Sequence, residues 1–177
     1  KIVTSEGLGL DTVSGGEVFT ALKAGVDPAM IELHGNAKSK AELKFALEEN
    51  VGVIIVDNLS ELEVLDNIAK EMGKKPEILL RVTPGVDSHT HAFIQTGNVD
   101  SKFGFTVEQV LESAAKAAID SENIDFRGIH FHVGSQLHEN DSHIKATGII
   151  LDMLTELREK FGYEPREINC GGGFGIH

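Results

Sequence analysis

Three consecutive glycines, Gly171, Gly172 and Gly173, follow the last short apolar segment of the chain. A glycine-rich turn after a strand lets the backbone approach a ligand closely and point its N–H groups at an anion. The triplet is therefore a candidate phosphate cradle. A tight turn without a ligand is the alternative, because glycine is the ordinary residue of both.

Two histidines lie two positions apart in the run His130-Phe131-His132-Val133-Gly134-Ser135. Residues two apart in a strand share a face. Three interpretations stay open: a metal-binding pair with no obvious third ligand nearby in sequence, a core histidine bonded to backbone, or His132 stacked on a planar cofactor. Ser135 follows Gly134 and could offer a hydroxyl and an N–H group to a phosphate.

Other charged residues stand where apolar segments end. Arg81 ends a very apolar segment, and a charge there must be paired or must face a polar opening. The run His34-Gly35-Asn36-Ala37-Lys38 fits a binding loop and a helix entry equally well. Asp11 and Glu17 flank a Ser-Gly-Gly turn, and a solvated turn is the default interpretation for both.

The elements that position these residues alternate regularly along the chain. Short apolar runs predict strands at residues 8–13, 30–34, 53–56, 77–83, 124–132 and 167–170. Longer amphipathic runs predict helices at residues 16–24, 39–49, 60–72, 106–119 and 142–161, with caps at Ser39, Thr106, Gly25 and Gly73. The last helix has Ile144, Ile149, Leu151, Leu154 and Leu157 on roughly one side.

The strand patterns predict an α/β fold. The runs at residues 53–56 and 78–80 are apolar without alternation, as in parallel strands covered on both faces. Polar residues follow nearly every strand, and a TIM-type (β/α)8 barrel gathers all such ends at one mouth, whereas an open sheet does not. We therefore predict a barrel. Six units are two short of eight, so we expect two further strands outside this chain.

Composition excludes several classes of function. The 177 residues carry a formal net charge of −12, which argues against nucleic acid or an anionic membrane as a partner. No apolar run approaches the length of a membrane span. Cys170 is the single cysteine and cannot form an internal disulfide, so we expect a reducing compartment, the cytoplasm. One long stretch at residues 84–102 has no regular pattern and is a functional candidate.

Six motifs together resemble the diaminopimelate decarboxylase family, in order and at familiar spacing. The resemblance covers essentially the whole chain, and the segment at residues 89–104 is closer to this family than to ornithine and arginine decarboxylases. The motifs are Gly9-Leu10-Asp11-Thr12-Val13-Ser14-Gly15-Gly16-Glu17, His34-Gly35-Asn36-Ala37-Lys38, Arg81-Val82-Thr83-Pro84-Gly85-Val86-Asp87, Thr96-Gly97-Asn98-Val99-Asp100-Ser101-Lys102-Phe103-Gly104, residues 130–136 and residues 171–175.

The resemblance implies a decarboxylase that depends on pyridoxal 5′-phosphate (PLP), with an alanine-racemase-like, fold type III barrel and a separate C-terminal β domain. Residues 1–177 would then be part of the PLP-binding barrel, strands two to seven. His132 would stack on the pyridine ring, and Asp11 and Arg81 would lie around the cofactor. The phosphate would be held by Ser135, Gly172 and Gly173.

The same resemblance implies the reaction and its partners. The substrate would be meso-2,6-diaminopimelate and the product L-lysine, in a cytoplasmic homodimer with no metal. The Schiff-base lysine, the acid facing the ring nitrogen and the donor cysteine would lie outside residues 1–177, since Lys1 and Cys170 do not match those family positions. We therefore expect the isolated chain to be inactive. Alternatives are a decarboxylase of ornithine, arginine or carboxynorspermidine, or a non-catalytic relative that binds PLP or a protein partner.

Overall fold

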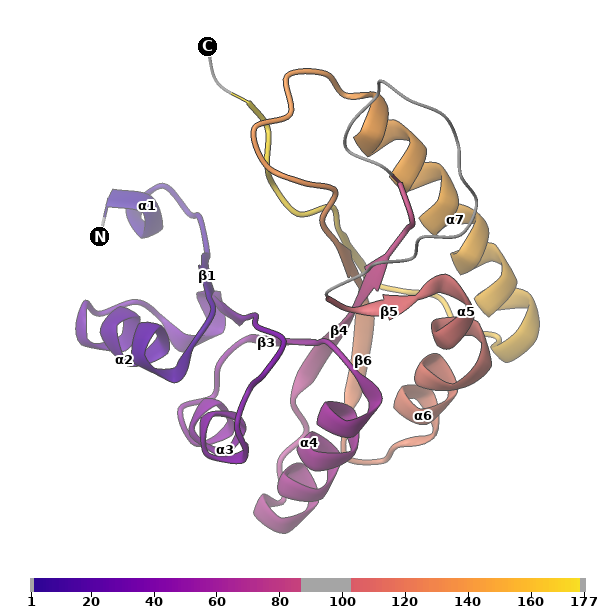
Figure 1. The fold of residues 1–177 in the computed structure, drawn as a ribbon. Helices are drawn as coiled ribbons and strands as arrows, with labels where there is room; N and C mark the ends of the chain where they lie inside the picture. The colour runs from indigo at the N-terminus through magenta and orange to yellow at the C-terminus, as the bar shows by residue number, and fades with distance from the viewer. Residues whose placement is uncertain (1, 87–102, 176–177) are drawn as a thin grey trace.

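A parallel sheet curled into a half-barrel forms the centre of the molecule (Figure 1). The computed structural model describes residues 2–86 and 103–175, so most of the irregular stretch predicted at residues 84–102 lies outside the described residues. The strands are β1 (Leu10–Thr12), β2 (Ile31–Leu33), β3 (Val53–Val56), β4 (Glu77–Thr83), β5 (Phe105–Thr106), β6 (Asp125–Phe131) and β7 (Glu167–Asn169).

Strand order follows the chain, which is the topology of a (β/α) barrel. The sheet runs β1-β2-β3-β4-β6-β7, every pairing is parallel, and the short β5 pairs beside the end of β4. The predicted α/β barrel class is thus confirmed, and all six predicted strands are present; helices follow the first five of them among the described residues. The predicted strands at residues 53–56 and 77–83 match residue for residue, whereas β5 was not predicted.

Helices cover the outer face of the sheet (Figure 1). The helical elements in chain order are α1 (Ile2–Ser5), which stands apart near the N-terminus, α2 (Gly15–Lys23), η1 (Pro28–Met30), α3 (Lys40–Glu48), α4 (Leu59–Met72), α5 (Val107–Gln109), η2 (Val110–Ala114), α6 (Ala115–Asp120) and α7 (Asp141–Phe161). Ser39 and Thr106 cap their helices, as predicted; each forms a capping box, with Glu42 and Gln109, and Gly73 ends α4 with a φ of 63°. The continuous helix predicted at residues 106–119 is instead interrupted by the π-helical turn η2.

The two faces of the sheet have different contents. Outward residues such as Ile54, Leu80 and Phe131 join the helices in one large apolar core. Among the described residues, the buried apolar cluster on the concave face is small and consists of Val53, Ile55 and Leu79. The rest of that face is polar, and it carries the candidate site.

The predicted apolar side of α7 is wrong in part. Ile144 is 67% exposed and Leu151 is 50% exposed, while Ile150 and Met153 are buried. The buried stripe is therefore rotated around the helix from the predicted one, because it follows the contacts with the outer core rather than every large apolar residue. None of the described helices is both long enough and apolar enough to cross a membrane.

Candidate active site at the carboxyl ends of the strands

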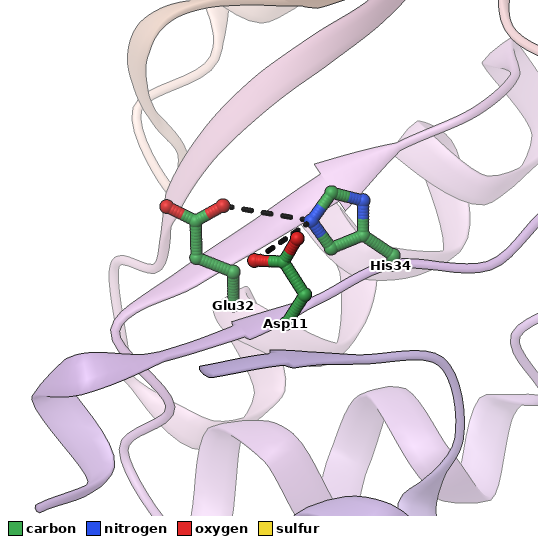
Figure 2. A group of neighbouring side chains, drawn as sticks. All are labelled: Asp11, Glu32 and His34. Atoms are coloured by element: carbon green, nitrogen blue, oxygen red, sulfur yellow. Dashed lines mark ion pairs between the residues drawn. The ribbon is translucent and has the colours of Figure 1, made fainter. Parts of the chain in front are cut away.

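A group of acidic and imidazole side chains lies at the carboxyl ends of β1 and β2 (Figure 2). The His34 Nε2 atom lies 3.7 Å from Asp11 Oδ1 and 3.5 Å from Glu32 Oε2. Glu32 on β2 lies two residues before His34, which directly follows that strand, and pairs in register with Asp11. The three side chains therefore share the concave face.

The carboxylates control the protonation of His34. Burial lowers the pKa of His34, but the contacts with Asp11 and Glu32 more than offset this, so the pKa lies above its ordinary value. The contact with His34 in turn lowers the pKa of Asp11. The Asp11 side chain is 74% exposed, so an ionised carboxylate is presented at the mouth of the half-barrel.

His130 lies across the concave face from His34. The two rings meet edge to face with centroids 4.9 Å apart. Burial, followed by the charges of His34 and Arg81, lowers the pKa of His130 to about 3. His130 is therefore neutral at physiological pH. It is the core histidine of the pair, and its neighbour His132 is the exposed one.

Arg81 on β4 faces the same mouth. Its guanidinium lies 3.9 Å from the buried carboxylate of Asp57 and over the ring of Phe103 at 4.9 Å. Burial lowers the pKa of Arg81, and the charge of Asp57 opposes that shift. Arg81 is thus a paired cation that faces a polar opening, as its position at the end of an apolar strand requires.

A buried ion pair supports the loops behind these residues. Lys38 Nζ lies 2.9 Å from Glu61 Oε1 and donates to the carbonyl oxygens of Gly35 (2.5 Å) and Ile55 (2.7 Å). Burial raises the pKa of Glu61 to about 7, against the opposing effect of Lys38. Lys38 therefore ties together the segments that follow β2 and β3.

The glycine turn after β7 packs directly on the turn after β6. A Cβ atom on Gly173 would lie 1.8 Å from the carbonyl oxygen of Gly134, and one on Gly171 would lie 2.9 Å from His132 Nδ1. Both glycines have positive φ, 94° and 66°. Leu137 locks the two turns together, since its N–H donates to Gly173 O (2.9 Å) and its carbonyl accepts from Gly175 N (2.7 Å).

This pair of turns leaves hydrogen-bond donors unused. Among the described residues, no hydrogen bond engages the N–H groups of Gly172 and Gly173 or the hydroxyl of Ser135. Gly172 is open on its Cβ side, with no atom within 4 Å. Free amides on a glycine turn beside an exposed imidazole suit an anionic group attached to a planar ring.

The structure thus places the sequence-predicted site residues in two neighbouring groups on one face. Asp11 and Arg81 surround the buried His34 and His130, and His132 lies beside the glycine turn. The charge of Arg81 reaches both groups, since it lowers the pKa of His130 and of His132. Ser135, Gly172 and Gly173 form the second group.

Sequence reasoning missed three residues of this site. Glu32 and Asn169 form a hydrogen bond across the concave face, Nδ2 to Oε2 at 3.0 Å. The alternation of residues 31–34 did place Glu32 beside His34, so that signal was available. His143 in the first turn of α7 stacks on Phe174 at 4.5 Å and its Nε2 lies 3.3 Å from Gly172 O. Nothing in the local sequence indicates that contact.

A separate cavity of about 270 Å³ lies at the opposite end of β4, near Ala46, Asn50 and Lys74. Its main cation is already engaged, because Lys74 Nζ donates to the carbonyl of Leu47 and to Asn50 Oδ1. Barrel enzymes use the carboxyl ends of the strands for chemistry, and this cavity lies at the amino ends. The candidate active site is therefore the polar mouth.

Comparison with known proteins identifies the class to which this arrangement belongs. The family model for the pyridoxal-binding domain of pyridoxal-dependent decarboxylases matches residues 1–177. The chain belongs to this family.

Particular relatives are diaminopimelate decarboxylases. The protein of that name from Bacillus methanolicus is 46% identical over 177 residues, 99% of this chain and 41% of that protein. The structure of diaminopimelate decarboxylase from M. jannaschii in co-complex with L-lysine has a TM-score of 0.87 and 38% identity, over 97% of this chain and 40% of that one. SrLDC, solved with PLP and cadaverine, has a TM-score of 0.79 and 26% identity, over 98% and 40%. The chain spans about 40% of the length of these relatives.

Proposed function

We propose that the protein containing this chain is a PLP-dependent decarboxylase that converts meso-diaminopimelate to L-lysine. The observation that carries the proposal is the pair of locked turns with unused amide and hydroxyl donors beside His132, at the mouth of a barrel whose family binds pyridoxal. Its relatives named diaminopimelate decarboxylase, one of them solved with L-lysine, support the substrate.

Each residue of the second group has a role in holding the cofactor. The N–H groups of Gly172 and Gly173 and the Ser135 hydroxyl would donate to the phosphate. His132, beside this group, would hold the pyridine ring by stacking. Burial and the charge of Arg81 lower the pKa of His132, so the stacked ring is a neutral imidazole. A neutral ring stacks on the cofactor without bringing an additional positive charge to it.

Asp11 and Arg81 of the first group would lie around the ring of the cofactor. When bound, PLP supplies an electron sink for the charge that the loss of CO2 leaves on the substrate. Asp11, ionised, would contact the ring of the cofactor from the mouth. Arg81, fixed by Asp57, provides a cation on the side of β4. These residues would bind and orient the cofactor.

The remaining machinery lies in the rest of the protein under this proposal. A Schiff-base lysine, an acid for the ring nitrogen and a donor cysteine would come from outside residues 1–177, together with two further barrel strands and a C-terminal β domain. The assembly would be a cytoplasmic homodimer. Residues 1–177 alone would then release no CO2.

Release of CO2 by the intact, PLP-loaded protein tests this function. We expect turnover with meso-diaminopimelate, formation of equimolar L-lysine, and far slower turnover with ornithine, arginine and carboxynorspermidine. Faster turnover of ornithine, arginine or carboxynorspermidine than of meso-diaminopimelate would assign the protein to a related decarboxylase with a different substrate. Binding of PLP with no CO2 from any of these amino acids would identify a non-catalytic relative and contradict the proposal.

A further inference from the structure

The Nε2 atom of the buried His34 ring contacts two carboxylates, those of Asp11 and Glu32 (Figure 2). The His34 side chain is 10% exposed, and its Nε2 atom has no hydrogen-bond partner among the described residues, only the ion pairs with Asp11 and Glu32. His34 lies between the Asp11 carboxylate, which faces the mouth, and the Glu32 carboxylate, which faces inward. His34 therefore connects the mouth to the interior of the half-barrel.

The inner carboxylate is itself held. Glu32 accepts the hydrogen bond from Asn169 on β7, so its position is fixed from both sides of the concave face. The ring of His130 on β6, packed edge to face against His34, restricts the position of the His34 ring from a third direction. Asn169, Glu32, His34 and Asp11 thus form a chain of polar contacts that begins on β7 and ends at the mouth.

We propose that His34 is a positioning residue that acts through Asp11, holding the Asp11 carboxylate ionised and in a fixed place at the mouth, while Glu32 and Asn169 hold His34. The inference rests on the proposed function, in which Asp11 contacts the cofactor. His34 itself contacts neither cofactor nor substrate. Its effect on cofactor binding is transmitted by the imidazolium–carboxylate contact.

The charges that face His34 are consistent with this role. Asp11 on β1 and Glu32 on β2 are anions, and they favour the imidazolium. His130 on β6 meets the His34 ring and is neutral. A charge on His132, which follows β6, would oppose the imidazolium, but burial and Arg81 lower the pKa of His132. The two carboxylates would repel one another without a cation between them.

A double-mutant cycle on the intact apoprotein tests the transmission through Asp11. The measured quantity is the PLP dissociation constant, followed by absorbance, for wild type, Asp11→Asn, His34→Gln and the double variant. We expect each single change to weaken binding about 5- to 50-fold, and the double variant to bind as Asp11→Asn alone does, because contacting residues are not additive. Ile55→Val, on the same face without a polar group, is the packing control and should add to Asp11→Asn.

The pH dependence supplies a readout that a purely structural role would not move. The pKa of His34 is raised, so its contribution is full at low pH and is lost as pH rises through that pKa. The ratio of dissociation constants between His34→Gln and wild type should therefore fall towards one at high pH. Glu32→Gln keeps the ring in place and should move this loss to lower pH, which also covers the case in which His34→Gln folds poorly.

Three results would overturn the inference. These are additive effects of Asp11→Asn and His34→Gln, a ratio that does not change with pH, or a loss of PLP affinity on dialysis against EDTA, which would assign the balancing charge to a divalent cation. Failure of the wild-type protein to bind PLP is a different outcome, because it contradicts the proposed function itself.

Discussion

Asn169 donates a hydrogen bond to Glu32 at 3.0 Å, although β7 and β2 are separated in the sheet by β3, β4 and β6. A flat sheet would hold these strands roughly 19 Å apart, four steps at about 4.8 Å each. The contact is possible only because the sheet curls. It spans the interior of the half-barrel and fixes the polar layer from which the mouth is built.

Asn169→Asp tests the value of that contact. Asp keeps the oxygen that accepts from Gly171 N (2.9 Å) but replaces the donor to Glu32 with a second carboxylate. We expect the free energy of unfolding of the intact protein to fall by about 1–3 kcal/mol at pH 7. The loss should diminish on acidification, as one carboxyl of the pair takes up a proton. Urea denaturation at pH 7 and pH 5 measures both, and equal stability of the two proteins at pH 7 would contradict the assignment.

Gly173→Ala should disrupt the phosphate cradle. Its Cβ would collide with Gly134 O, and its φ of 94° disfavours any side chain. We expect a loss of stability of more than about 1 kcal/mol together with a large loss of PLP affinity. Gly148→Ala, in α7 and outside the site, is the matched control, because no atom lies within 4 Å of its added Cβ. Similar PLP affinity in the two variants would show that the packing of the two turns does not govern the site.

His132 offers a test of stacking against other roles of an imidazole. His132→Phe keeps a flat ring beside the glycine turn but removes both nitrogens, whereas His132→Ala removes the ring. We expect His132→Ala to weaken PLP binding by about 1–3 kcal/mol, the size of a base–aromatic stacking contact, and His132→Phe to retain most of the affinity. Equal losses in both variants, measured by titration of the apoprotein, would mean that a ring nitrogen matters instead.

The buried Lys38–Glu61 pair should be expensive to break. Lys38→Met removes the partner of a buried carboxylate and of two carbonyl groups, so we expect a loss of about 3–5 kcal/mol in the free energy of unfolding. Lys44→Met is the control, since Lys44 is exposed and pairs with Glu48 at 3.8 Å along α3. That change should stay within about 0.5 kcal/mol. A comparable loss in both proteins would refute a special role for the buried pair.

The strands and most helix caps were predictable because their causes are local. The unbroken apolar runs of β3 and of the centre of β4 and the capping box of Ser39 each follow from a few adjacent residues. The π-helical turn η2 and the rotated buried face of α7 were not predictable, because packing against distant elements determines them. The same holds for the site. Period-two alternation brings Glu32 beside His34, but the contact with Asn169 depends on the curvature of the whole sheet.

A crystal structure of the intact protein with PLP bound tests the proposed cofactor site most directly. We expect the phosphate within hydrogen-bonding distance of the N–H groups of Gly172 and Gly173 and of the Ser135 hydroxyl. We also expect the pyridine ring to stack on His132, with Asp11 close to the ring. A phosphate bound elsewhere, or a pyridine ring that makes no contact with His132, would contradict the proposed site.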